Sequence, residues 1–365
     1  MIESKLLTSA ERAAFSLRSL YSENGYLPFK MSKFEEYELY VRNKEFLISD
    51  NVIAFNDTDG RLLAMKPDVT LSIIKNTVCQ PGCKQKVYYN ENVYRVSHKT
   101  HRFKEIMQAG LECIGDTDII DLYEVIDLAQ KSLAKLSCDF ALDISHLGIL
   151  SKVLSTASSD VAFIREATAL IAEKNKHELS ALCQRFGVEA KYEDIISELA
   201  TVYGEPKEVL PKLLPICRLV GATDAYDELA ALCDMLLDSS DADKIRIDFS
   251  VVNDMNYYNG VVFKGFLKGV PDGILAGGEY GMLMHRMGKE AGAIGFAIYL
   301  DMLEEIREPM REYDVDVLVI YPDDFDAKEL VALKNKLLGE GKCVSMQRAI
   351  PEKLRYKEII RLDNK

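Results

Sequence analysis

The sequence predicts an α+β fold, with an antiparallel sheet that is flanked by helices and interrupted by a helical insertion. Strand-like and helical runs come in separate blocks along the 365 residues. Segregation of this kind favours an antiparallel sheet over a parallel one, in which strands and helices alternate. From about 147 to 240 the strand signals disappear and apolar residues recur at helical spacing, which indicates the insertion.

The first predicted element is a helix over residues 8–23. Its apolar residues follow helical spacing, and Thr8 is followed three positions later by Glu11. This pair is typical of a capping box, in which the two side chains bond backbone N–H groups that have no partner inside the helix. Gly25 marks the end of the helix, because glycine is the preferred residue just past a helix C-terminus.

Two antiparallel strand pairs are expected next. Residues 52–56 and 62–66 flank an Asp-Thr-Asp-Gly segment, which is a hairpin signal because Asp-Gly tolerates the backbone of tight turns. Residues 85–96 and 103–115 form a second and longer pair around a polar loop. The helices predicted after these pairs cover residues 70–78 and 116–136.

The last third of the chain returns to strands. We expect a strand over 244–252, a glycine-rich turn at 275–281 and a strand-to-helix run over 292–306. A small βαβ-like unit with a basic tail follows, made of a strand at 314–322, a helix at 326–339 and a strand at 342–347. The predicted domains are a core of residues 1–146 and 244–312, a helical insertion of residues 147–243, and a C-terminal α/β unit of residues 313–365.

The composition is that of an ordinary globular chain, with 48% hydrophobic and 28% charged residues. The net charge of −13 argues against nucleic acid as a partner, because binding to phosphates requires clustered Lys and Arg. No apolar run approaches the ~20 residues that cross a bilayer, so no membrane role is expected. The start lacks a signal peptide pattern and the eight cysteines are scattered, so we expect reduced thiols and a cytoplasmic location.

No metal or cofactor is predicted. Cys79, Cys83, His98 and His101 are four possible zinc ligands in a short window, but their spacing matches no standard zinc pattern. The Pro-Gly between the two cysteines indicates a loop. The chain also contains neither of the glycine-rich patterns, GxxxxGK[ST] and GxGxxG, that bind phosphate groups of nucleotides.

Polar residues inside otherwise apolar strands form the candidate site. Gln108 and Glu112 lie four residues apart, so an extended strand points both to one face. Arg95 on the partner strand suits a carboxylate, and Asp68 and Thr70 occupy alternate positions of an extended stretch. Together they suit an α-amino acid with a polar side chain. Solvated strand faces explain the same spacings about equally well.

Two pairs of neighbouring residues allow a functional and a structural interpretation. Gly277 and Gly278 could let a ligand approach the backbone, although adjacent glycines more often form a tight turn. Tyr257 and Tyr258 could contact a ligand, although aromatic residues of this kind are more often part of a sheet.

Five blocks of the sequence, taken together, resemble the catalytic domain of histidyl-tRNA synthetase, a class II aminoacyl-tRNA synthetase. The resemblance covers roughly residues 1–312 and implies the class II antiparallel sheet with a helical insertion; residues 313–365 resemble the first part of the synthetase's anticodon-binding domain, cut short. The blocks are MKPDVT (65–70), NVYR…RFKEIMQAGLECIG (92–115), NDMNYYNGVVF (253–263), AGGEYG (276–281) and GFAIYLDML (295–303).

The resemblance implies a retained histidine pocket. Asp68 and Thr70 stand where the synthetase holds the amino group of histidine, and Arg95 matches the arginine of its second motif. Gln108 and Glu112 match the residues that sense the amine and the imidazole. The residues expected to bind histidine are Asp68, Thr70, Arg95, Gln108, Glu112, Tyr257, Tyr258 and Tyr280.

The residues that activate ATP in the synthetase are not retained. Asn253 and Met302 replace arginines of the histidine-specific motif and of the third motif, and the position of the glutamate that reads adenine falls near Ser97. Glu279 replaces a further arginine, and an acid beside a phosphate would add repulsion. Preorganised cations contribute several kcal/mol to such a reaction. The resemblance therefore implies a pocket that binds without catalysis, and no catalytic residue is expected.

This combination resembles the family of regulatory subunits of short-form ATP phosphoribosyltransferases, which usually have an aspartate at the position of Asp68. It implies a non-catalytic subunit that the catalytic subunit requires in the first step of histidine biosynthesis, with L-histidine as the feedback effector. A homodimer within a hetero-octamer is then expected. The alternatives are a divergent histidyl-tRNA synthetase or stand-alone adenylate-forming paralogue, and a paralogue with a structural role only.

Overall fold

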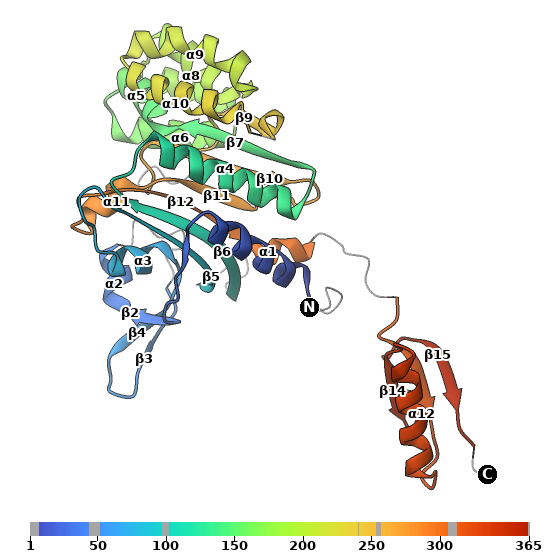
Figure 1. The fold of residues 1–365 in the computed structure, drawn as a ribbon. Coiled ribbons are helices and arrows are strands. Elements are labelled where there is room, and N and C mark those ends of the chain that lie inside the picture. Colours follow the sequence, from blue (N-terminus) through green and yellow to red (C-terminus); the bar gives the residue numbers. More distant parts are fainter. Residues whose placement is uncertain are drawn as a thin grey trace. The chain divides into compact units, whose positions relative to one another are not determined.

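The computed structural model describes residues 7–43, 52–96, 102–239, 241–252, 257–305 and 312–363. It confirms the predicted α+β class (Figure 1). The chain divides into two compact units, Met1–Ile306 and Arg307–Lys365.

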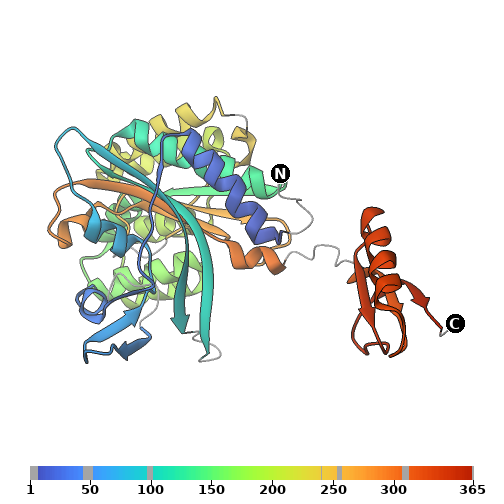
Figure 2. The ribbon, with the colours of Figure 1, turned by 60° about the horizontal axis from the view of Figure 1, so that its bottom comes forward.

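A nine-stranded sheet forms the centre of the first unit (Figure 2). Neighbouring strands are antiparallel except for β1 with β5 and β7 with β9. The predicted long pair is confirmed, because β5 and β6 pair along their whole length from Lys84 opposite Gly115 to Val96 opposite Phe103. The strand order is β1 (Leu27–Pro28), β5 (Lys84–Val96), β6 (Phe103–Gly115), β12 (Gly292–Tyr299), β11 (Leu275–Glu279), β10 (Val261–Leu267), β7 (Phe140–His146), β9 (Ile245–Asp248) and β8 (Tyr203–Gly204).

Helices α1 (Ser9–Glu23) and α4 (Ile119–Leu136) lie along one face of this sheet (Figure 1). Helix α1 begins with the predicted capping box, in which Thr8 and Glu11 each accept a backbone N–H of the other. The alternation of β6 explains how the sheet is used. Leu111 and Cys113 are buried in the core under these helices, so Gln108 and Glu112 face the opposite side.

Among the described residues between β7 and β9, six α-helices form the predicted helical segment, and they gather at the β7–β9 end of the sheet (Figure 1). Their apolar faces belong to the same hydrophobic core as α1 and α4. The two-residue strand β8 lies between the fourth and fifth of them and pairs with β9. The helices are α5 (Leu147–Ala157), α6 (Val161–Ala172), α7 (Lys176–Arg185), α8 (Ala190–Thr201), α9 (Pro206–Val220) and α10 (Thr223–Leu236).

A second hydrophobic core covers part of the other face of the sheet. It combines Leu71 and Ile73 of one helix with Leu283 and Met284 of another. A three-stranded sheet, in the order β2-β4-β3, contains the predicted hairpin, since β3 pairs antiparallel with β4. The elements on this side are β2 (Phe34–Glu36), α2 (Tyr37–Arg42), β3 (Ala54–Asn56), β4 (Leu62–Met65), α3 (Thr70–Asn76) and α11 (Gly281–Arg286).

Three local predictions were wrong. The strand expected over 244–252 ends at Asp248, whereas the strand-to-helix run expected over 292–306 is confirmed as β12 followed by a 3-10 helix, η4 (Leu300–Glu305). The residues expected to be extended around Val69 are not, because Val69 has helical angles (φ −92°, ψ −41°) and α3 begins directly after it. The glycine-rich segment at 275–281 is mostly strand β11, not a turn. A Cβ on Gly277 would lie 2.5 Å from the backbone oxygen of Gly295, so glycine is required by close strand packing.

The second unit is a three-stranded parallel sheet with one helix. Strands β13 (Val315–Ile320) and β14 (Val344–Gln347) and helix α12 (Ala327–Gly339) confirm the predicted βαβ arrangement. Strand β15 (Tyr356–Arg361), which also pairs with β13, lies in the segment expected to be a basic tail. Charged and apolar residues do not alternate regularly in this segment, so its sequence gives no strand signal, and pairing with β13 decides its structure. No helix within the described ranges is long and apolar enough to span a membrane.

Candidate site in a cavity of the central sheet

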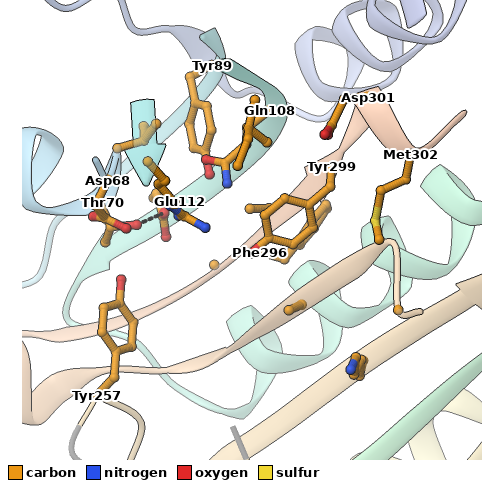
Figure 3. A pocket seen from close by; sticks show the side chains of 18 of the residues that line it. Asp68, Thr70, Tyr89, Gln108, Glu112, Tyr257, Phe296, Tyr299, Asp301 and Met302 are labelled. Carbon is orange, nitrogen blue, oxygen red and sulfur yellow. Dashed lines mark hydrogen bonds between the residues drawn. The ribbon is translucent and has the colours of Figure 1, made fainter. Parts of the chain in front are cut away.

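A cavity of about 570 Å³ opens on the sheet face opposite α1 and α4. All eight residues predicted to bind histidine line it, although they come from five separate segments of the chain. They are Asp68, Thr70, Arg95, Gln108, Glu112, Tyr257, Tyr258 and Tyr280. Figure 3 shows Asp68, Thr70 and Glu112 together at one end of the cavity and Asp301 and Met302 at the other.

Glu112 is the most constrained of these residues. Its side chain is 2% exposed, and it accepts hydrogen bonds from the Thr70 hydroxyl (2.8 Å) and the Tyr280 hydroxyl (2.6 Å). A Cβ on Gly295 of the neighbouring strand would overlap the Glu112 carboxyl group, so the glycine leaves the space that this group occupies. Burial raises the pKa of Glu112 to about 8, against the two hydrogen bonds that lower it.

Asp68 is the second buried acid. Its carboxylate accepts the backbone N–H of Leu71 at 3.0 Å, near the start of α3. Burial raises the pKa of Asp68, and the Leu71 N–H and the Arg95 guanidinium partly offset this. Arg95 is held in place because its Nε donates to the backbone oxygen of Pro67 at 3.0 Å. The charge of Asp68 also raises the pKa of Glu112, so a ligand with a positive group would stabilise both carboxylates.

Tyrosines form an aromatic wall beside the acids. The rings of Tyr257 and Tyr258 lie 4.5 Å apart between centroids, and those of Tyr257 and Tyr280 lie 5.8 Å apart. Tyr257 and Tyr258 precede β10 in a turn and do not belong to a strand. Gln108 is 3% exposed and lines the cavity on the same strand face as Glu112. The prediction that these two residues share a face is confirmed.

The cavity also contains polar residues that sequence reasoning missed. Tyr89 lies six residues before Arg95 on β5, so the same alternation that selected Arg95 could have found it. Lys264 and Asp272 form an ion pair at 2.9 Å across the β10–β11 connection, and no sequence pattern indicates it. The missed lining residues with polar groups are Tyr89, Lys104, Lys264, Asp272, Tyr299 and Asp301.

The residues that stand in place of the synthetase's arginines differ in whether they line the cavity. Met302 lines the cavity, at the end far from Glu112 (Figure 3). Glu279 does not line it, and its carboxylate instead accepts the backbone N–H of Val261 at 2.6 Å. The expected repulsion between Glu279 and a phosphate in the cavity was therefore wrong. Strand alternation places Glu279 on the face of β11 opposite Ala276 and Tyr280. Asn253 and Ser97 lie outside the described residues.

The described residues contain no group of three or more potential metal ligands. Cys79 is partly exposed and Cys83 is exposed, and both are free thiols. His98 and His101, the other two residues considered for zinc, lie outside the described ranges.

The arrangement suits recognition more than reaction. One end of the cavity combines two buried acids, an amide and several phenol groups, which together match an ammonium group and a second nitrogen-bearing group. The other end contains Met302 where a cation would be needed to stabilise charge on a phosphate.

Comparison with known proteins gives consistent results. A family model described as histidyl-tRNA synthetase matches residues 5–303. A protein of Oceanobacillus iheyensis, named ATP phosphoribosyltransferase regulatory subunit, is 26% identical over 346 residues, which cover 93% of this chain and 85% of that protein.

Two solved structures are similar in fold. One, from Bacillus halodurans, is described as an ATP phosphoribosyltransferase regulatory subunit/histidyl-tRNA synthetase; its TM-score is 0.77 at 20% identity, covering 97% of this chain and 93% of that one. The other belongs to the ATP phosphoribosyl transferase (HisG:HisZ) complex of Thermotoga maritima; its TM-score is 0.64 at 22% identity, covering 79% of this chain and 96% of that one. At these identities the two structures establish the class II synthetase-like fold alone.

Proposed function

The chain belongs to the histidyl-tRNA synthetase family, and from this premise we propose that it is a non-catalytic regulatory subunit of a short-form ATP phosphoribosyltransferase. In this proposal, L-histidine binds in the described cavity and inhibits the first step of histidine biosynthesis. The core comprises residues 1–146 and 244–312, residues 147–243 are the helical insertion, and residues 313–365 correspond to part of an anticodon-binding domain.

The observation that carries the proposal is the asymmetry of the cavity. The end that suits an amino acid has a complete set of polar groups around Glu112 and Asp68. The opposite end presents Met302, which cannot stabilise the negative charge that develops when a phosphate is attacked. The name of the Oceanobacillus iheyensis relative, which matches over most of both chains, supports the same function.

We assign the groups of L-histidine by charge. Its ammonium group lies near Asp68 and Thr70, its carboxylate near Arg95, and its imidazole near Glu112. The tyrosine rings of residues 257, 258 and 280 enclose the ligand. Because burial disfavours ionised Glu112 in the empty cavity, the positive charge of the ligand is what makes its ionisation favourable.

Feedback inhibition requires more than binding. L-histidine must have different affinities for two states of the assembly, because a ligand with equal affinity for both states shifts nothing. The assembly proposed is a cytoplasmic hetero-octamer in which this chain forms a homodimer and the partner subunit performs catalysis. No nucleic acid or membrane takes part.

The first test measures phosphoribosyl-ATP formation by the short-form catalytic subunit of the same genome. We expect activity to appear when this chain is added and to fall when L-histidine is added. Calorimetry should show L-histidine binding that Asp68→Ala abolishes. Activity that is indifferent to this chain would refute the regulatory role.

The competing enzyme function has its own test. A divergent histidyl-tRNA synthetase or adenylate-forming paralogue would catalyse histidine-dependent exchange of pyrophosphate into ATP. We expect no such exchange, and exchange at a rate typical of synthetases would decide in favour of the enzyme. A chain that neither exchanges pyrophosphate, nor binds L-histidine, nor activates the catalytic subunit would have a structural role only.

A further inference from the structure

Tyr89 has an unusual position in the cavity. Its side chain is 2% exposed, yet it is one of the residues that line the cavity. In Figure 3 the ring extends from β5 toward Gln108, on the side of the cavity where Glu112 lies. The phenol group therefore reaches into the part of the cavity proposed to hold the amino acid.

Gly110 makes this position possible. Tyr89 and Gly110 are direct partners in the β5–β6 pairing, and Gly110 lies between Gln108 and Glu112 on the same face of β6. A Cβ on Gly110 would lie 2.2 Å from the backbone oxygen of Phe296, 2.5 Å from the Tyr89 hydroxyl oxygen and 2.7 Å from the ring carbon that bears it. The hydroxyl group thus occupies the space of a missing side chain, between the two polar residues of β6.

The Tyr89 hydroxyl has no hydrogen-bond partner among the described residues. Its oxygen is not one of the fully buried oxygens that lack a partner, so it is open to the cavity, and tyrosine hydroxyl groups in such positions usually find a partner. Burial and the nearby Glu112 carboxyl raise the pKa of Tyr89 well above its ordinary value, so the group keeps its proton and remains a hydrogen-bond donor. A partner supplied by a ligand would complete the site.

We propose that Tyr89 is a specificity-determining residue whose hydroxyl group hydrogen-bonds a polar atom of the amino-acid ligand between Gln108 and Glu112. This inference rests on the proposed function, because it takes L-histidine as the ligand. It adds to the cavity a contact that neither the sequence pattern nor the resemblance had indicated. Gly110 acts with Tyr89 as a positioning residue, since a larger residue would clash with both the Phe296 backbone and the phenol group.

The test compares Tyr89→Phe with Tyr88→Phe in the full chain. Tyr88 is the matched control, because it is the preceding residue of the same strand and packs against Tyr21 of α1 on the other face. L-histidine affinity is measured by calorimetry, and the melting temperature is measured without and with L-histidine. We expect Tyr89→Phe to weaken binding about tenfold, which corresponds to about 1.4 kcal/mol.

A purely structural role for Tyr89 predicts that Tyr89→Phe lowers the melting temperature of the free chain and leaves the affinity for L-histidine unchanged. The proposed binding role predicts that the melting temperature of the free chain is unchanged or higher, while the shift caused by L-histidine becomes smaller. Equal affinities for the wild type and Tyr89→Phe would overturn this inference and leave the proposed function intact. A wild-type chain that does not bind L-histidine would overturn both.

Discussion

The ionisation of Glu112 leads to a quantitative prediction about stability. The pKa of Glu112 is about 8 in the folded chain, against the ordinary value of 4.5. Between these values the folded chain retains a proton that the unfolded chain has released. Stability must therefore fall as the pH rises through this window, because the unfolded state binds fewer protons. Glu112→Gln removes the ionisation and keeps an amide oxygen as an acceptor for Thr70 or Tyr280.

The magnitude follows from the size of the shift. Each pH unit inside the window lowers the free energy of unfolding by about 1.4 kcal/mol for one such group. From about pH 5.5 to about pH 7.5 the wild type should lose about 2 to 3 kcal/mol of unfolding free energy through Glu112, and Glu112→Gln should not. The free energy of unfolding of the variant, relative to that of the wild type, therefore rises by that amount across this pH range.

Urea unfolding at several pH values in this range measures the difference. The chain contains no tryptophan, so far-UV circular dichroism is the suitable signal. Glu198→Gln serves as the control, since Glu198 is an exposed residue of α8. Comparing each variant with the wild type at the same pH cancels the titration of distant groups, whose effects are additive.

A difference in unfolding free energy between Glu112→Gln and the wild type that stays constant across this pH range would refute this prediction. That result would mean that Glu112 is ionised in the folded chain at neutral pH. The charge-based account of ligand binding would then lose its physical basis, because the empty cavity would already tolerate the carboxylate.

Three further predictions concern other residues. Burial and the nearby Asp248 raise the pKa of Asp143 to about 7. The stability of the chain should therefore fall between about pH 4 and 7, and Asp143→Asn should make the urea midpoint depend less on pH over that range. An unchanged pH profile in the variant would contradict this. Lys66 is fully buried and forms an ion pair with Glu91 at 2.8 Å. Glu91→Gln leaves the lysine without its ionic partner and should lower the free energy of unfolding by about 3 kcal/mol. A loss below about 1 kcal/mol would show that the ion pair is not needed for stability. Gly295→Ala should abolish L-histidine binding in calorimetry, because the added methyl group takes the space of the Glu112 carboxyl group; retained affinity would mean that the site repacks.

Local patterns predicted those parts of the fold that depend on neighbours in sequence. The capping box of Thr8 and Glu11, the hairpin around Asp59-Gly60 and the length of β5 and β6 are examples, and the structure confirms each. The prediction of a turn at 275–281 was wrong because it, too, was based on local preference alone. Its local preference is a turn, but contact with β12 requires glycine inside a strand.

The candidate site divides in the same way. Strand alternation, which is a property of the chain itself, was sufficient to place Gln108 and Glu112 on one face. Alternation could not show that Glu279 bonds the backbone of Val261 or that Lys264 meets Asp272, because both contacts join separate segments. Tyr89 combines both cases. Strand alternation could predict which face of β5 it lies on, but not that its hydroxyl group has no partner among the described residues.

The sequence by itself therefore determined the class of fold, the order of its elements and the side chains available on each strand face, because these depend on spacing along one chain. Only the tertiary structure decided which of these side chains share a cavity and how strongly burial opposes their ionisation. The pKa of Glu112 is the clearest case. This pKa is raised because β12, α3 and the aromatic wall exclude water from the carboxyl group, and those segments lie far from residue 112 in the sequence.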